Sequence, residues 1–234
     1  MRRSTKQHLA AWAMVALICL VLLLGFRQMY GETASGMTID RARREIRFSA
    51  VVQPKAMEKR FGVRGHHAIV WREGKSAPYA LFRSDASDRE VRRALEALGA
   101  VAGENLTAAS WNLRNDRNSL EPDKRVEGTP VEVFVEWQGS GRRLAISELV
   151  EEKGLSRPSL DLRYGGNERF QPEFQSGCIV CLYSCPGGAI GNHAHPIRDY
   201  VRDGVVYSAI RERLPRAGTH VTIILRPRSR EEAS

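Results

Sequence analysis

Cysteine is scarce in this chain of 234 residues, which has only four. Three of them, Cys178, Cys181 and Cys185, lie within the stretch at 176–192, SGCIVCLYSCPGGAIGN. The fourth, Cys19, lies in an apolar run near the N-terminus, where it serves as a small apolar residue. With so few cysteines elsewhere, composition alone does not account for three in so short a segment.

Signatures of several function classes are absent. The net charge is +9, with 30 Arg against 6 Lys scattered through periodic segments, and no aromatic ladder, zinc-finger spacing or helix-turn-helix pattern accompanies it. Nucleic-acid binding is therefore not expected. No Ser-His-Asp or paired-carboxylate arrangement supports a hydrolase. The YGGN segment at 164–167 lacks the following Lys and Ser or Thr of a phosphate-binding loop, so a nucleotide site is not indicated.

The N-terminal part predicts a membrane anchor. Residues 10–26, AAWAMVALICLVLLLGF, carry no charge and would span about 25 Å as a helix, close to the ~30 Å hydrocarbon core. Three positive side chains precede this run within 1–9 and Arg27 follows it closely, so 1–9 would be a cytoplasmic tail and 10–26 a transmembrane signal anchor. We expect a single-pass inner-membrane protein with a periplasmic bulk. A cleaved signal peptide, with small residues at 33–35, is the alternative.

The rest of the chain predicts one domain of mixed α and β structure. With 42% hydrophobic residues it has enough apolar side chains for a real core. Short segments alternate apolar and polar residues between turns, which indicates antiparallel hairpins. These segments are 46–50, 66–71, 77–82, 131–137, 144–146 and 221–225. We assign the domain to 37–225 and a tail to 226–234, with a long surface loop at 112–130.

One helix stands out at 88–98. Ser87 and Glu90 have the spacing of a capping box, and Gly99 supplies a stop signal. The residues between them form an i, i+3, i+4, i+7 apolar stripe, namely Val91, Ala94, Leu95 and Leu98. This helix should pack on the sheet. The expected fold class is therefore α+β: a transmembrane helix, then a mixed domain with hairpins, this packing helix and a short helix or loop that bears the cysteines.

The three clustered cysteines are spaced i, i+3 and i+7, so a two-turn helix would place all of them on one face. Gly177 before them and PGG at 186–188 after them would bound that helix. Free cysteine also packs as a small hydrophobe, so core packing among the neighbouring apolar residues is one interpretation. Three chemical interpretations stand beside it.

The first chemical interpretation is a metal centre. The pattern C-x2-C-x3-C-P matches part of the ferredoxin run C-x2-C-x2-C-x3-C-P, with one cysteine missing. Either His193 or His195, in the segment GNHAHP, would complete a set of three cysteines and one histidine. Such a set suits zinc or an iron–sulfur cluster.

The other two chemical interpretations are a redox thiol set and a structural disulfide. If Cys178 begins a helix, the helix dipole would make it the attacking thiol, with Cys181 as the resolving thiol and Cys185 left over. A structural disulfide is permitted outside the cytoplasm and leaves one thiol unexplained.

Four polar residues near the cysteines in the sequence are candidates for support of the site. Asp161 and Arg163 alternate with leucines, so both would project from one strand face and an ion pair is expected there. Asn167 closes the segment that precedes the cysteines, and Asn192 closes the cysteine stretch itself.

SLDLRYGGN at 159–167, the cysteine stretch and IRDYV resemble the YdjY-like family of exported bacterial proteins. HHAIVWREG, ALEALGA, VAGENLT and VEVFVEW are similar to blocks of that family in the same order, so the resemblance covers 37–225. It implies a ferredoxin-like or iron–sulfur label without an established biochemical role. The chain departs from the family at KSAPYA, where many members have an acidic, histidine-containing turn, and His193 and His195 are not marks of the family.

We therefore expect a membrane-anchored extracytoplasmic protein whose Cys178, Cys181 and Cys185 bind a metal or iron–sulfur centre or act as a redox thiol set. A redox or electron-transfer protein would be its partner. The competing expectation is a non-catalytic interaction or structural domain, with the cysteines as a disulfide staple or as core packing. The sequence does not decide whether the protein is an enzyme.

Overall fold

The computed structural model describes residues 30–32, 36–57, 65–116, 118, 120, 123–200 and 205–228. The expected tail at 1–9 and anchor at 10–26 lie outside these residues. Among the helices that the structure describes, none is long and apolar enough to cross a membrane. The longest has 10 residues, which is about 15 Å, half of a bilayer core. Within the described residues, this finding runs against the transmembrane helix expected in the fold and against the single-pass inner-membrane placement that depended on it.

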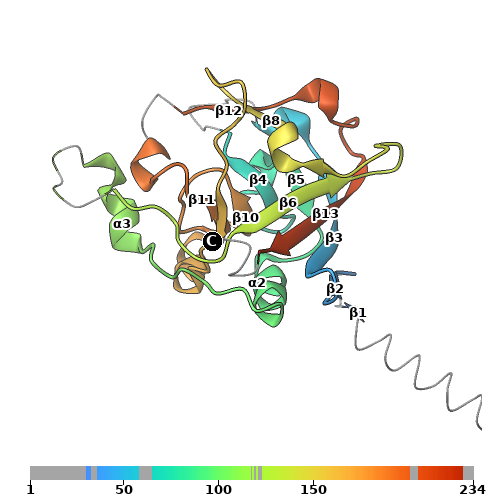
Figure 1. The fold of residues 1–234 in the computed structure, drawn as a ribbon. Helices are drawn as coiled ribbons and strands as arrows, with labels where there is room; N and C mark the ends of the chain where they lie inside the picture. The colour runs from blue at the N-terminus through green and yellow to red at the C-terminus, as the bar shows by residue number, and fades with distance from the viewer. Residues whose placement is uncertain are drawn as a thin grey trace, which may run out of the picture.

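Strands are the main regular structure of the described chain, and one large mixed sheet curls into a half-barrel (Figure 1). Its strands run in the order β7-β6-β13-β3-β5-β4-β10-β11-β9, with β2 beside β3 and β1 beside β2, while β8 and β12 form a separate two-stranded sheet. The strand bounds are β1 Tyr30–Glu32, β2 Thr38–Asp40, β3 Glu45–Val52, β4 His67–Trp71, β5 Phe82–Ser84, β6 Val131–Glu136, β7 Leu144–Ala145, β8 Val150–Glu152, β9 Leu162–Tyr164, β10 Cys178–Cys181, β11 Gly188–Asn192, β12 Tyr207–Ala209 and β13 His220–Pro227.

Helices contribute little to the described residues. The α-helices are α2 Asp88–Ala97, α3 Ala108–Asn112 and α4 Gln171–Phe174. Short 3₁₀ turns join the other elements: Pro54–Met57, Ala77–Tyr79, Leu113–Asn115, Ile146–Glu148, Glu168–Phe170, Ile197–Tyr200 and Arg211–Arg213. The predicted α+β class is therefore wrong, because only α2 exceeds five residues and the fold is mostly β.

Most of the alternating segments form strands where they were expected, but the segment at 77–82 is a strand only at its end and pairs differently with the segment at 66–71. The segments at 46–50, 131–137 and 221–225 lie in β3, β6 and β13, and β13 pairs antiparallel with both of the others. The segments at 66–71 and 77–82 do not form a hairpin, because β4 and β5 are parallel. A 3₁₀ turn with a proline occupies the start of the second segment, so that strand begins only at Phe82.

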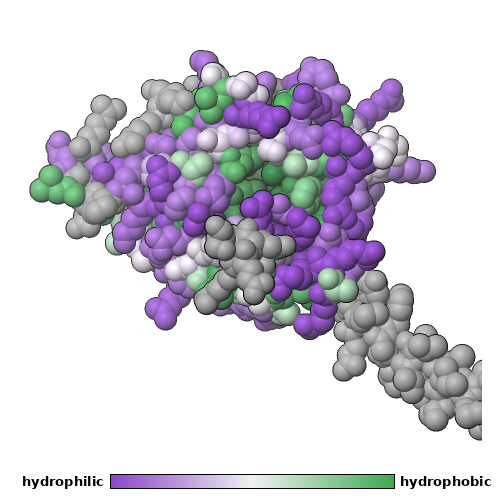
Figure 2. Space-filling view, viewed as in Figure 1, coloured by the Kyte–Doolittle hydropathy of each residue, from purple (hydrophilic) through white to green (hydrophobic). Residues whose placement is uncertain are grey.

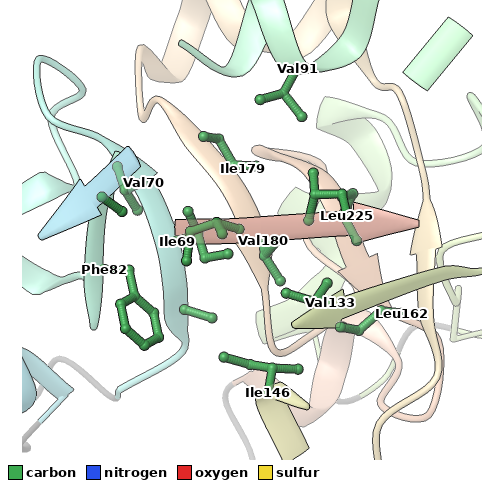
Figure 3. Close-up of a cluster of buried hydrophobic side chains, with 14 of the residues drawn as sticks. Ile69, Val70, Phe82, Val91, Val133, Ile146, Leu162, Ile179, Val180 and Leu225 are labelled. Carbon is green, nitrogen blue, oxygen red and sulfur yellow. The ribbon is translucent and has the colours of Figure 1, made fainter. Parts of the chain in front are cut away.

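The helix predicted at 88–98 is confirmed as α2. Ser87 accepts the backbone N–H of Glu90, and the Glu90 carboxylate accepts that of Ser87, so the capping box forms. Gly99, with φ of +79°, ends the helix in the left-handed region. The apolar stripe is buried, and Figure 3 shows Val91 facing Ile179 of β10.

The half-barrel encloses a single large apolar core that reaches both ends of the sheet (Figure 3). Where β6 comes near β9, a cavity of about 330 Å³ is lined by residues that include Val131, Ile146 and Leu162. Figure 2 shows apolar side chains at the centre of the face of the molecule that is in view, surrounded by polar ones. A second, smaller core cluster holds Leu106, Trp111, Val126, Phe170 and Ile197, and Cys185 packs against both clusters.

Candidate functional site: a buried thiol cluster

The first two clustered cysteines lie at the ends of strand β10, so the predicted cysteine-bearing helix is wrong. β10 pairs antiparallel with β4 on one side and parallel with β11 on the other. The register with β4 shifts between Cys178 and Val180 and again between Val180 and Cys181. Residues three apart in a regular strand point to opposite faces, whereas a bulge turns them toward the same side. The irregular strand thus places Cys178 and Cys181 on the same side, as the expected helix would have done.

The three thiols form one cluster with Cys181 in the middle. Its side chain is in hydrogen-bonding contact with the thiols of both Cys178 and Cys185. Cys178 is 1% exposed and Cys181 is 0% exposed, while Cys185 is half-buried. All three are free cysteines. Cys185 is therefore the least buried residue of the cluster.

Two glycines on the return segment allow the close approach of these thiols. A Cβ at Gly188 would lie 3.1 Å from Cys181 Cβ and 3.7 Å from Cys178 Sγ, and one at Gly187 would lie 3.5 Å from Cys185 Sγ. The backbone N–H groups of both glycines donate to the Cys185 sulfur. Glycine in this turn therefore provides space, and its amides form a small cradle for a thiolate.

Burial and mutual contact keep the thiols of Cys181 and Cys185 protonated. It raises the pKa of Cys181 well above the usual value, and the neighbouring Cys178 thiol adds to the rise. The pKa of Cys185 is also raised well above its usual value, first by the Cys181 thiol and then by burial. The amides of Gly187 and Gly188 act in the opposite direction. At neutral pH Cys181 and Cys185 are thus neutral thiols, and they gain nucleophilicity as pH rises.

His67 lies next to Cys178, at the buried end of the cluster. It was not among the site residues predicted from the sequence. Its Nδ1 lies 3.5 Å from Cys178 Sγ, and its backbone lies opposite Cys181 across the β4–β10 pair. Burial lowers its pKa well below 6.5, and the adjacent His66 lowers it further. The imidazole is therefore neutral at pH 7. No spacing motif marks this contact, because 111 residues separate the two side chains in the sequence.

The two histidines predicted as extra ligands are engaged elsewhere. His193 Nδ1 lies 2.7 Å from the carbonyl oxygen of Val126. His195 lies between two carboxylates, with Nε2 3.2 Å from Glu152 Oε1 and Nδ1 3.2 Å from Asp199 Oδ2. Both imidazoles thus stabilise loops around the β-structure.

The polar residues predicted as site support separate into three kinds. Asp161 and Arg163 form the expected ion pair, at 2.8 Å, and both are partly exposed. Asn192 is 0% exposed and makes five hydrogen bonds through its side chain. Asn167 is 2% exposed, and neither atom of its amide has a hydrogen-bond partner among the described residues.

A metal centre does not fit the geometry of the described residues. Within them, no group of three or more His, Cys, Asp or Glu side chains could hold a metal ion. A zinc or iron–sulfur site needs its ligands arranged around one point. Here Cys181 lies between the other two thiols, and His67 contacts Cys178, at the buried end of the cluster. The expectation of a metal-binding protein is corrected accordingly.

Comparison with known proteins covers most of the chain. Residues 37–226 match a family model described as the YdjY domain. The uncharacterized protein YdjY of Escherichia coli (strain K12) is 30% identical over 126 residues, which make up 54% of this chain and 51% of that protein. The chain thus spans about half the length of this curated relative. No solved structure matches it.

Proposed function

On the premise that the chain belongs to the YdjY domain family, we propose that Cys185 and Cys181 form a redox-active dithiol that exchanges with a disulfide of a partner. The observation that carries the proposal is the direct contact of a half-buried thiol with a fully buried one. Redox dithiols commonly combine an accessible attacking thiol with a protected resolving thiol.

Cys185 takes the attacking role in this proposal. It is the least buried of the three clustered cysteines, and two backbone N–H groups at Gly187 and Gly188 stabilise its thiolate. The attacking role that sequence analysis gave to Cys178 depended on a helix N-terminus, and this residue instead begins a strand. Cys178 is fully buried and contacts Cys181, so we assign it no part in the exchange.

The exchange balances in two steps. The Cys185 thiolate attacks the partner disulfide, forms a mixed disulfide and releases one partner thiolate. The Cys181 thiolate then attacks Cys185 Sγ, which closes an intramolecular disulfide and releases the second partner thiolate. Two electrons pass to the partner, and the two protons lost by Cys185 and Cys181 end on its two thiols. Because the pKa values of both cysteines are raised, the rate should increase with pH above neutrality.

Thiol chemistry on the full chain tests the proposal. Incubation with oxidised glutathione should yield a Cys181–Cys185 disulfide, detected by mass spectrometry of the peptides. Cys181→Ser should accumulate a glutathione adduct on Cys185, because the resolving thiol is gone. Cys185→Ser should abolish both products, while Cys178→Ser, the matched control, should still close the disulfide.

Two outcomes would contradict the proposal. If all three clustered cysteines stay unmodified in the folded protein and react only in denaturant, the cluster is core packing. If the purified chain carries iron or zinc in stoichiometric amount and loses it with each of the three serine variants, the thiols are ligands.

A further inference from the structure

A cavity of about 680 Å³, separate from the thiol cluster, opens beside the first turn of α2. That turn forms one wall, and the segment at 168–177 forms the opposite wall. The volume lies within the range of small-molecule sites. The residues that decide its chemistry are Trp71, Lys75, Arg89, Arg92, Glu168 and Gln171.

Arg92 lines this cavity with a buried guanidinium that makes no hydrogen bond among the described residues. Its side chain is 5% exposed, and none of its three guanidinium nitrogens has a hydrogen-bond partner among the described residues. The carboxylate paired with it is that of Asp88, at 3.7 Å, which is too long for a hydrogen bond. Since a guanidinium carries five N–H donors, leaving all of them unsatisfied in a buried place is costly.

Carboxylates lie near Arg92 without a hydrogen bond to it among the described residues: the charges of Asp88, Glu168 and Glu104 act on its guanidinium through space. The Glu90 carboxylate, which also lines the cavity, accepts hydrogen bonds from the backbone and hydroxyl groups of Ser87. Lys75 and Arg89 add positive charge, and Glu73, Asp88 and Glu168 add negative charge. The positive end of the α2 dipole points toward the same space. A ligand with one anionic group and an otherwise neutral or cationic body fits this mixture.

A second unsatisfied group lies next to the cavity wall. Asn167 directly precedes Glu168, which lines the cavity, and its buried amide has neither a donor nor an acceptor partner among the described residues. Its backbone has φ of +53°, in the left-handed region. Unsatisfied buried polar groups and local strain gather where a ligand completes the structure.

We propose that Arg92 binds the carboxylate or phosphate group of a small molecule in this cavity. A planar guanidinium pairs with either group through two parallel hydrogen bonds, which gives geometric selectivity that a lysine lacks. Gln171 connects this site to the thiol cluster, because it lines the cavity and donates through Nε2 to the carbonyl oxygen of Gly187 at 2.5 Å.

Titration of the full chain with inorganic phosphate, and separately with acetate, tests the site. The readout is the Nε–Hε signal of arginine side chains in NMR spectra, with Arg92 assigned by its loss in Arg92→Lys. We expect saturable movement of this signal with at least one of the two anions. Arg92→Lys should weaken binding about tenfold, measured by calorimetry, because the two-pronged contact is lost. The phosphate and acetate series distinguish the two ligand classes.

Arg93→Lys is the matched control, since Arg93 is exposed on the same helix. It should bind as the wild type does, and circular dichroism and melting temperature establish that each variant is folded. If Arg92→Lys does not fold, the saturable shift of the Arg92 signal in the wild type, assigned by sequential NMR, decides. The proposal is overturned if neither anion shifts that signal, or if the Arg92→Lys and Arg93→Lys variants bind the anions equally well.

Discussion

Two buried asparagines, Asn192 and Asn167, show how differently this fold treats the same side chain. Asn192 Oδ1 accepts the backbone N–H of Asp161 and of Ala194, at 2.8 and 3.1 Å. Its Nδ2 donates to the carbonyl oxygens of Ser159 and Leu182 and to the hydroxyl of Tyr207. The amide of Asn167, equally removed from solvent, has no such bond among the described residues.

The difference distinguishes polar groups that stabilise the fold from polar groups that remain available to a ligand. The Asn192 side chain connects the end of β11 to the segment that precedes β9 and to Tyr207 of β12, so it stabilises the fold and has no donor or acceptor left for a ligand. The buried amide of Asn167 makes no hydrogen bond among the described residues that would offset its loss of hydration. The same holds for the guanidinium of Arg92, which lines the adjacent cavity. Polar groups that the fold leaves unsatisfied are the ones that a ligand can engage.

The largest expected effect is that of Asn192→Ala. Truncation removes the hydrogen bonds to two backbone N–H groups and two carbonyl groups, of which the Ser159 carbonyl keeps the Tyr207 hydroxyl as a donor. Each group left unsatisfied in a buried place costs about 1–3 kcal/mol. We expect the free energy of unfolding in urea to fall by about 3–5 kcal/mol. Asn105→Ala is the control, because this partly exposed residue bridges only Arg125 and Glu127. If the two variants lose equal unfolding free energy, Asn192 does not have the special role in stabilising the fold that its five hydrogen bonds predict.

Next in size is a pH effect at His67, whose imidazole contacts the Cys178 thiol. Burial lowers its pKa well below 6.5, so below pH 6.5 the unfolded chain takes up a proton that the folded chain does not. Stability is therefore lost as pH falls from 6.5 toward the folded pKa, by at most about 1.4 kcal/mol per pH unit.

His67→Gln should flatten this dependence between pH 7.5 and 5, measured as the urea midpoint at each pH. His220→Gln is the control, since His220 is exposed on β13 and should leave the slope unchanged. An identical slope in the wild type and in His67→Gln would mean that His67 becomes charged within the fold.

Local signals in the sequence predicted what local interactions form. The capping box and apolar stripe of α2 involve residues at most eleven apart, and strict alternation marked β3, β6 and β13. The same reasoning failed at the cysteines. Their i, i+3, i+7 spacing fits a helix, but two register shifts in β10 bring Cys178 and Cys181 to the same side of a strand.

Contacts between distant segments could not be read from the sequence. The parallel pairing of β4 with β5 and the contact of His67 with Cys178 both depend on the path of the whole sheet. Asn167 and Asn192 were both predicted to support the thiols, because both are polar and lie close to the cysteines in the sequence. Only the structure shows that one is saturated with hydrogen bonds and the other is not.

The smallest expected effect is that of Asn167→Gly. Glycine adopts φ of +53° without a steric cost, and the substitution removes two buried polar atoms that have no partner among the described residues. These gains offset the greater freedom of glycine in the unfolded chain, so the unfolding free energy should change by less than about 1 kcal/mol in either direction. Gln175→Gly, at another left-handed and exposed position, is the control. A loss at Asn167 as large as that at Asn192 would mean that its amide also holds the fold together, and the distinction between the two asparagines would then fail.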